Sequence, residues 1–299
     1  MSADPMSAQN VSKMTKIEAK QLLQKWREDN VRNSETVRDI WLNMDFGSTL
    51  GDEKWQVLEQ VCIAAIDLHD NELIKDCLQQ LDTKFANSSR VRRLKIMAKY
   101  ELRERFEDAF QAYEQMIEKD ESNSLLYKRQ IAILLAERRI GEAIKELCDY
   151  LKKFMNDTEA WLQLSDLYVE EQEYNKAAYC VEELILANPH NHLYHERYAA
   201  IQYTINTTES LELSRTYFSQ ALRLNPNNLR ALYGLLLAAN SVASLPKTTS
   251  QKKRENLRIA SWASNQISRL YKDNSSDDEN RIVAMEGMLA NLQITSNST

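Results

Sequence analysis

The chain has 299 residues, of which 43% are hydrophobic, so it is long enough to bury a large core. Its 44 acidic and 38 basic residues give a formal net charge of −6. This balance disfavours sequence-independent binding of nucleic acid, which requires a dominant positive surface. Only 5 glycines and 4 prolines occur. Because these residues mark turns and interrupt helices, their scarcity predicts long helices joined by short connections.

The sequence shows no pattern typical of a membrane span or of a cofactor site. No apolar stretch approaches the roughly 18 residues that a spanning helix requires, and the N-terminal segment lacks the apolar centre of a secretory signal. The four cysteines are widely separated, which favours a reducing compartment. We expect no cofactor, because the chain has no glycine-rich phosphate loop, no HExxH and no nucleophile elbow.

The predicted elements begin after residues 1–15, a segment that we expect to be mobile. An amphipathic helix follows, with Ile17, Leu23 and Trp26 on one stripe. A helix pair then extends to about Ala86. Beyond it lie three regular units, at residues 90–123, 124–157 and 158–191.

The regular units are identified by the spacing of small and large residues. The clearest unit contains, in order, Trp161, Leu164, Ser165, Tyr168, Ala177, Val181 and Pro189. This order is typical of the tetratricopeptide repeat (TPR), whose period is about 34 residues. Steps of this length lead from Ala177 back to Ala143 and Ala109, and from Val181 back to Leu147 and Tyr113. A small residue lets two helices approach closely, and the larger residue fills the space against the next pair.

Weaker units flank the regular ones. Downstream, Phe218, Ala221 and Pro226 repeat the end of the pattern, and two further helices are expected at residues 231–244 and about 252–272. We therefore predict one TPR-type solenoid over residues 16–272, with degenerate repeats on both sides of the regular ones. By composition, residues 273–281 form an acidic polar linker and residues 282–295 a closing helix.

This organisation predicts an all-α fold, a right-handed superhelical TPR solenoid of stacked antiparallel helix pairs. Such a stack has a groove, lined mainly by first helices, that suits a segment of another protein. The residues that we expect to line this groove are Leu94, Lys128, Leu162 and Asp166. A clamp for a C-terminal carboxylate needs a Lys and an Asn at first-helix positions. It is disfavoured, because only Lys128 fits.

A basic stretch at residues 90–105 has two interpretations. The first is an ordinary solvated helix face. The second is a contact face for anionic lipid headgroups or an acidic partner. Its residues would be Arg90, Arg92, Arg93, Lys95 and Lys99.

The histidines His190, His192 and His195 form the one cluster that suggests chemistry. A metal site would require their nitrogens to converge on one ion at about 2.0–2.1 Å. His190 and His192 are expected in a turn and His195 in the next helix, so we favour a polar turn of hydrogen-bonding histidines. The prediction is a protein without metal or enzymatic activity, and a metal-dependent enzyme is the alternative based on this cluster alone.

Several stretches carry a family resemblance. They are KWREDN at 25–30, AWLQLSDLYVEEQEYNKAAYCVEELILANPHNHLY at 160–194, LELSRTYFSQALRLN at 211–225 and ASWASNQISR at 260–269. These stretches resemble the family of subunit 2 of the endoplasmic reticulum (ER) membrane protein complex, a TPR family. The resemblance extends from about residue 16 to about residue 294. NPHNHLY and ASWASNQISR are distinctive, because a generic repeat does not require them.

The resemblance implies a non-enzymatic scaffold, bound peripherally to the cytoplasmic side of the ER membrane through its partners. The family's complex inserts tail-anchored and multi-pass proteins, and its second subunit binds cytosolic parts of membrane-embedded subunits and a soluble subunit. The implied partners are therefore the other subunits, membrane-embedded and soluble, and not nucleic acid. The alternative is a free cytosolic TPR adaptor or co-chaperone. In mild detergent, a scaffold should co-purify with membrane subunits, whereas an adaptor should not.

Overall fold

The computed structural model describes residues 14–44, 46–246, 248–274 and 287–288. Every regular element in these ranges is a helix, and none of the described residues belongs to a strand. The all-α class is therefore confirmed. The predicted mobile segment 1–15, linker 273–281 and closing helix 282–295 fall outside the described residues, apart from a few positions at their ends and Gly287 and Met288.

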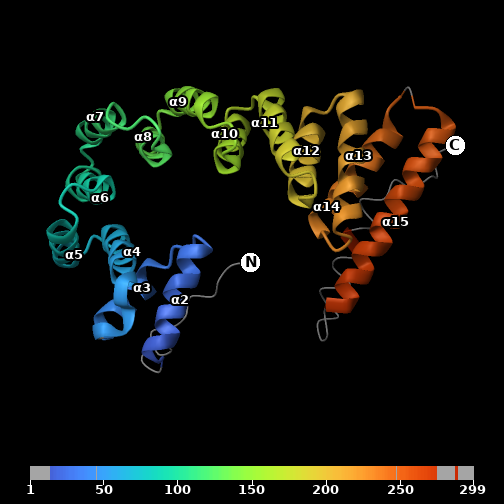
Figure 1. Ribbon diagram of the computed structural model, residues 1–299. Coiled ribbons are helices and arrows are strands. Elements are labelled where there is room, and N and C mark those ends of the chain that lie inside the picture. Colours follow the sequence, from blue (N-terminus) through green and yellow to red (C-terminus); the bar gives the residue numbers. More distant parts are fainter. Residues whose placement is uncertain (1–13, 45, 247, 275–286, 289–299) are drawn as a thin grey trace. The chain divides into compact units, whose positions relative to one another are not determined.

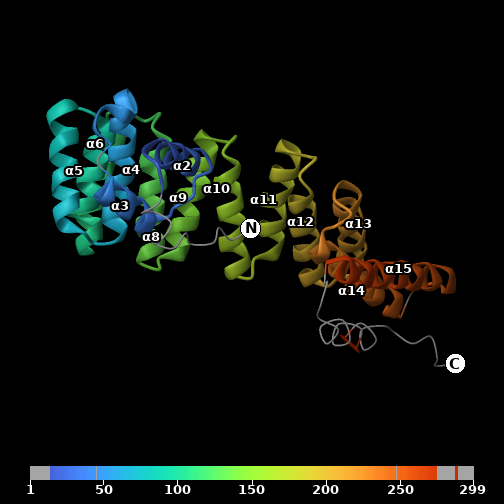
Figure 2. The same cartoon turned by 90° about the horizontal axis from the view of Figure 1, so that it is seen from below.

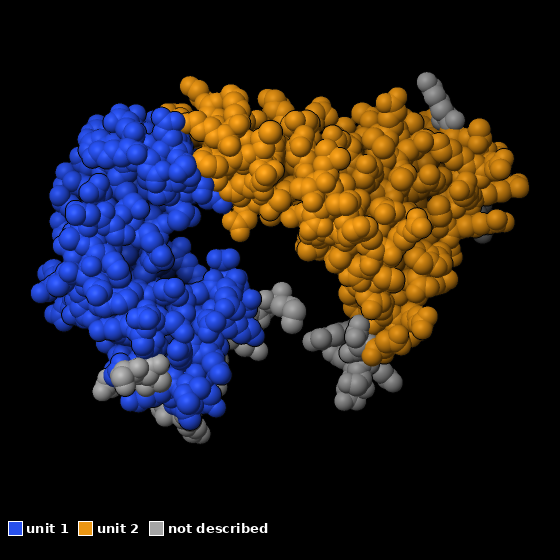
Figure 3. All heavy atoms as spheres, in the orientation of Figure 1, with its two compact units in different colours: residues 1–139 blue, residues 140–299 orange. Residues whose placement is uncertain are grey.

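The chain forms two compact units, residues 1–139 and 140–299 (Figure 3). The boundary falls inside the predicted repeat 124–157, between its first and its second helix. One continuous solenoid over residues 16–272 therefore stays a prediction.

Both units consist of consecutive helices (Figure 1). The first unit contains α2 (Lys16–Glu28), α3 (Ser34–Asn43), η1 (Gly47–Glu53), α4 (Lys54–Asp67), α5 (Asn71–Lys84), α6 (Ser89–Lys99), η2 (Glu101–Arg103), α7 (Phe106–Ile117) and α8 (Ser124–Ala136). The second contains α9 (Ile140–Lys153), α10 (Thr158–Glu170), α11 (Tyr174–Ala187), α12 (His192–Ile205), α13 (Thr208–Leu224), α14 (Leu229–Ser244) and α15 (Ser250–Asn274). Neighbouring helices pack side by side, for example α4 with α5 and α12 with α13 (Figures 1 and 2).

The small and large positions of the three predicted repeats lie in the core. These positions are all fully buried: Ala109, Tyr113, Ala143, Leu147, Ala177 and Val181 are each 0% exposed. Ser165, where the TPR pattern has Gly, is also 0% exposed. Its hydroxyl donates to the carbonyl oxygen of Ala177 at 3.3 Å, so the buried polar group is paired. The hydroxyl therefore ties the two helices of this pair together.

In six helix pairs, from α2–α3 to α12–α13, the turn between the two helices contains one residue in the left-handed conformation. The φ angle lies between 53° and 61° at Asn30, His69, Glu104, Arg138, Gln172 and Asn206. This conformation lets the chain cap the preceding helix: past Gln172, the amide of Glu173 donates to the carbonyl of Tyr168 at 2.8 Å. These residues carry side chains in a region that costs roughly 1–2 kcal/mol for an L-residue with a Cβ.

Glycine at such a turn is therefore expected to stabilise the chain. Gln172→Gly should raise the free energy of unfolding by about 0.5–1 kcal/mol, because glycine adopts positive φ without a steric cost. The matched control, Gln163→Gly within α10, should lower it by about 1 kcal/mol, because a helix-interior glycine is unfavourable. Urea unfolding followed by circular dichroism measures both. A Gln172→Gly chain less stable than the parent would contradict the assignment.

Candidate protein-binding groove

A groove crosses the first helices of the first unit. Its larger part is a cavity of about 800 Å³ bounded by α2, the α2–α3 turn and α4. Its smaller part, of about 300 Å³, lies between α4, the end of α5 and α6. Both parts are lined by Gln56, Glu59 and Arg90. We call these two cavities together the first-unit groove.

The larger cavity combines an apolar lining with side-chain amides. Val31, Val37, Ile63 and Ala64 supply apolar surface. The amides belong to Gln24, Asn30, Asn33, Gln56 and Gln60. A side-chain amide both donates and accepts hydrogen bonds, which are the two functions that a peptide group presents. A largely apolar concavity with a few convergent polar groups is typical of a binding site, and this chemistry suits a polypeptide segment.

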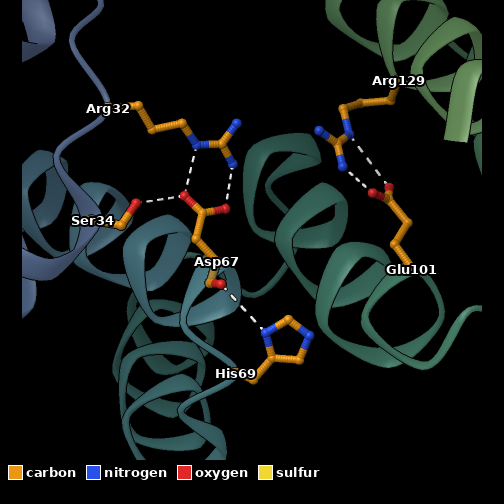
Figure 4. A network of polar contacts seen from close by, with 6 residues as sticks. All are labelled: Arg32, Ser34, Asp67, His69, Glu101 and Arg129. Atoms are coloured by element: carbon orange, nitrogen blue, oxygen red, sulfur yellow. Dashed lines mark hydrogen bonds and ion pairs between the residues drawn. The ribbon is translucent and has the colours of Figure 1, made fainter.

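The edge of the groove at the α2–α3 turn is held by Asp67, at the C-terminal end of α4 (Figure 4). The Arg32 guanidinium donates twice, from Nε to Oδ2 at 2.7 Å and from Nη2 to Oδ1 at 2.6 Å. The Ser34 hydroxyl donates to the same Oδ2 at 2.6 Å. Such bidentate, charge-assisted pairs fix geometry as well as energy. The turn is therefore held rigidly against α4.

A second carboxylate joins α4 to α6. Glu59 accepts a hydrogen bond from Nη2 of Arg93 at 3.0 Å and is also paired with Arg90. Its side chain is 12% exposed, whereas that of Arg90 is 64% exposed. Arg90 therefore keeps much of its surface open to the groove while Glu59 compensates its charge.

The wall formed by α2 and the start of α4 is joined by Glu53. Arg27 donates to Oε1 of Gln60 at 3.0 Å, and Lys20 lies 2.9 Å from Oε1 of Glu53. The other carboxylate oxygen of Glu53 is buried and accepts no hydrogen bond from the described residues, but it forms an ion pair with Nη2 of Arg27 at 3.7 Å. Burial lowers the pKa of Arg27, an effect that the Glu53 carboxylate opposes. Glu53 therefore connects two cations of α2 to the start of α4.

Two aromatic residues of the smaller cavity were not predicted from the sequence. Trp55 and Phe85 meet edge to face with ring centroids 5.5 Å apart, and Phe85 is 39% exposed. Lys54 and Lys84 lie over the Trp55 ring at 5.4 and 6.0 Å. In the sequence, Trp55 stands at the start of a first helix and Phe85 at the end of a second helix. These positions alone do not tell whether an aromatic side chain is buried in the core or exposed at the surface.

The predicted groove residues are divided between the two units. Leu94 is 1% exposed and belongs to the core. It forms part of the floor of the smaller cavity. Lys128 is half-buried on α8 and lines neither part of the first-unit groove. In the second unit, Leu162 is half-buried on α10, and Asp166 is paired with Arg197 of α12. Contact of these residues with a partner stays a prediction.

Most of the predicted basic contact face is engaged within the first unit. Arg90 and Arg93 pair with Glu59, and Lys95 pairs with Asp82. Lys99 lies over the ring of Tyr100 at 4.8 Å. Arg92 is exposed and has no carboxylate partner among the described residues. The role of this face in binding also stays a prediction.

The histidine cluster makes internal hydrogen bonds. Nε2 of His195 lies 2.8 Å from the carbonyl oxygen of Pro189, and the ring stacks on Tyr217. His192 contacts the side-chain amides of Asn225 and Asn228 at 3.2 and 3.1 Å. In the described part of the chain, no group of three or more potential metal ligands is arranged around one ion.

The cysteines on α4 and α5 are fully buried, and burial raises the pKa of the Cys62 and Cys77 thiols to about 12. These two thiols therefore stay protonated and weakly nucleophilic at neutral pH.

Antiparallel helix pairs in TPR register, with a polypeptide-sized groove across first helices, define the chain as a TPR-repeat protein. Similarity to a solved structure supports this class. The C-terminal part of a TPR repeat-containing protein from Cytophaga hutchinsonii matches with a TM-score of 0.54 and 12% identity, over 89% of this chain and 98% of that one.

Sequence comparisons identify the family. The family model described as EMC2 TPR-like repeat domain matches residues 74–222. ER membrane protein complex subunit 2-B of Xenopus laevis is 45% identical over 275 residues, covering 90% of this chain and 92% of the relative. The subunit 2 of Dictyostelium discoideum is 30% identical over 272 residues, covering 86% of this chain and 83% of the relative. The chain belongs to the family of ER membrane protein complex subunit 2. Within the residues that the structure describes, no helix has both the length and the apolar character needed to cross a membrane.

Proposed function

We propose that the chain is a non-enzymatic scaffold subunit of an ER membrane protein complex. It is bound peripherally on the cytoplasmic side and supports the insertion of tail-anchored and multi-pass membrane proteins. Its partners are other subunits of the complex, membrane-embedded and soluble. The relatives named for this complex support the proposal, because they match over nearly the whole length of both chains.

The single observation that carries the binding role is the first-unit groove. Its lining matches the needs of a polypeptide: an apolar surface and amides that pair with peptide groups. The groove edges are held by Asp67 and Glu59, so its shape exists before a ligand binds. A preformed site binds with a smaller entropic cost than one that must be ordered. We infer that this groove binds a cytosolic segment of a membrane-embedded subunit.

The groove is tested by a matched pair of substitutions at exposed glutamines. Gln56, on the first helix α4, lines both parts of the groove, whereas Gln79 lies on the second helix α5 and lines neither. Gln56→Arg should reduce recovery of membrane-embedded subunits by at least about tenfold, because it replaces a neutral amide with a large cation at the groove centre. A loss of about 1.4 kcal/mol of binding free energy produces this change. Gln79→Arg should leave recovery unchanged.

The measurement is affinity purification of the tagged chain in mild detergent, with quantitative identification of bound chains. Circular dichroism confirms that both variants keep their helicity. Equal recovery with Gln56→Arg and Gln79→Arg would rule out the groove as the binding site. Absence of membrane subunits from the parent chain's purification would instead contradict the scaffold role and favour a free adaptor.

A further inference from the structure

The helix α15 is the last described helix of the second unit (Figures 1 and 2). A stripe of cations with a central tryptophan runs along its solvent face. Arg254, Arg258, Trp262, Arg269 and Lys272 are all exposed, and Trp262 is 49% exposed. At 100° per residue, these positions share an arc of about 80°. The opposite face packs on α14 through buried residues that include Ala260, Ala263 and Ile267. The described residues of this unit therefore leave the stripe exposed to solvent.

The charges of this stripe differ from those on α6. On α6, Arg90, Arg93 and Lys95 are compensated by carboxylates of other helices. On α15, neither Arg254 nor Arg258 has a carboxylate partner in the described part of the chain, and Arg269 is paired only with the exposed Asp273 of the same helix, at 3.7 Å. This cationic stripe belongs to a chain whose net charge is −6, so the positive potential is local.

We propose that this face of α15 binds the surface of a membrane that contains anionic phospholipids. Tryptophan is favoured at the level of lipid headgroups, where its ring is buried and its N–H stays solvated. Arginine and lysine around it pair with lipid phosphates. The stripe spans about 27 Å along the helix axis, enough for the helix to lie flat on the surface. The inference goes beyond the scaffold role, which requires no direct contact with lipid.

An acidic protein would also complement the cations. A protein partner would need a pocket fitted to the Trp262 ring, whereas a headgroup layer accepts an exposed ring together with the cations around it. These observations favour the lipid surface, and binding of a protein subunit is an outcome of the test below.

The experiment is flotation of the purified full chain with vesicles on a density gradient, in which aggregated protein sinks and lipid-bound protein rises. Vesicles of phosphatidylcholine alone are compared with vesicles that also contain phosphatidylinositol. The parent chain should float only with the anionic vesicles, and less at high salt. Each basic residue contributes about fivefold to such binding, so Arg254→Glu/Arg258→Glu should weaken it by at least about 25-fold. Trp262→Ala should also weaken it.

The matched control is Lys75→Glu on α5 combined with Lys145→Glu on α9, which changes the net charge by the same amount at exposed positions outside α6 and α15. It should bind vesicles like the parent. Brominated lipids should quench the fluorescence of the parent chain and not that of Trp262→Phe. The proposal is overturned if the parent does not float, or if the Lys75→Glu/Lys145→Glu control loses binding as much as the α15 variant. It is equally overturned if the α15 variant loses a protein subunit yet floats normally.

This test separates the two proposals. Failure of vesicle binding with normal recovery of membrane subunits would remove the lipid surface and leave the scaffold role intact. Loss of recovery with Gln56→Arg, together with normal vesicle binding, would leave both in place.

Discussion

Replacing Gly234 by alanine should destabilise the second unit by about 2 kcal/mol. Gly234 lies on α14 against the ring of Phe218, a 4% exposed residue of α13. A Cβ at Gly234 would have three carbon atoms of that ring within 2.6 Å, closer than real contacts allow. Overpacking of this kind costs typically 1–3 kcal/mol and occasionally more, and the higher helix propensity of alanine returns only about 1 kcal/mol. The steric cost therefore dominates.

Gly141→Ala provides the matched control, because Gly141 lies in α9 and a Cβ there would meet nothing within 4 Å. This variant should gain up to about 1 kcal/mol from helix propensity alone. Hydrogen exchange, resolved to peptides of α13 and α14, should show faster exchange in Gly234→Ala and not in Gly141→Ala. Adding Phe218→Leu to Gly234→Ala should cost less than the sum of the single variants, since the smaller side chain relieves the clash. Additive costs would show that the ring contact is not the cause.

Glu101→Gln should destabilise the first unit by about 2–3 kcal/mol. Glu101 accepts a hydrogen bond from the Tyr113 hydroxyl at 2.6 Å and is paired with Arg129 of α8 (Figure 4). The side chains of Glu101 and Arg129 are 14% and 25% exposed, and Tyr113 is fully buried. Burial alone would lower the pKa of Arg129, but the charge of Glu101 raises it overall. Removing that charge leaves a largely desolvated guanidinium without its counter-ion, which is strongly unfavourable.

An exposed ion pair provides the control, because replacing its carboxylate by an amide removes a charge that is not buried. Asp149 and Lys152 are paired on α9 with side chains 49% and 75% exposed, so Asp149→Asn should leave the free energy of unfolding nearly unchanged. Hydrogen exchange in α7 and α8 should rise in Glu101→Gln only. If urea unfolding shows equal losses for the two variants, the network around Glu101 does not stabilise the first unit as we infer.

The first-unit groove and the cationic stripe on α15 were only partly predictable from the sequence. The basic run at residues 90–105 can be recognised in the sequence. The ion pairs of Arg90 and Arg93 cannot, because their partner Glu59 lies in another repeat. Trp262 lies in the distinctive ASWASNQISR stretch, yet periodicity does not show which side of a long helix is left uncovered. Gly234 illustrates the same limit, since its neighbour Phe218 belongs to a different helix.

The repeat register was determined by the sequence alone. Ala109, Ala143 and Ala177 recur at one period, and each is fully buried, because helix periodicity places residues on a face before any tertiary contact forms. Only the tertiary structure decided which surfaces stay open: the groove draws on α2, α4 and α6. It also decided that Arg90 and Arg93 of α6 pair with Glu59, whereas Arg254 and Arg258 of α15 have no carboxylate partner in the described part of the chain. The reason is physical. Burial of an apolar face follows from local spacing, whereas the neutralisation of a charge depends on a partner that packing brings from a distant part of the chain.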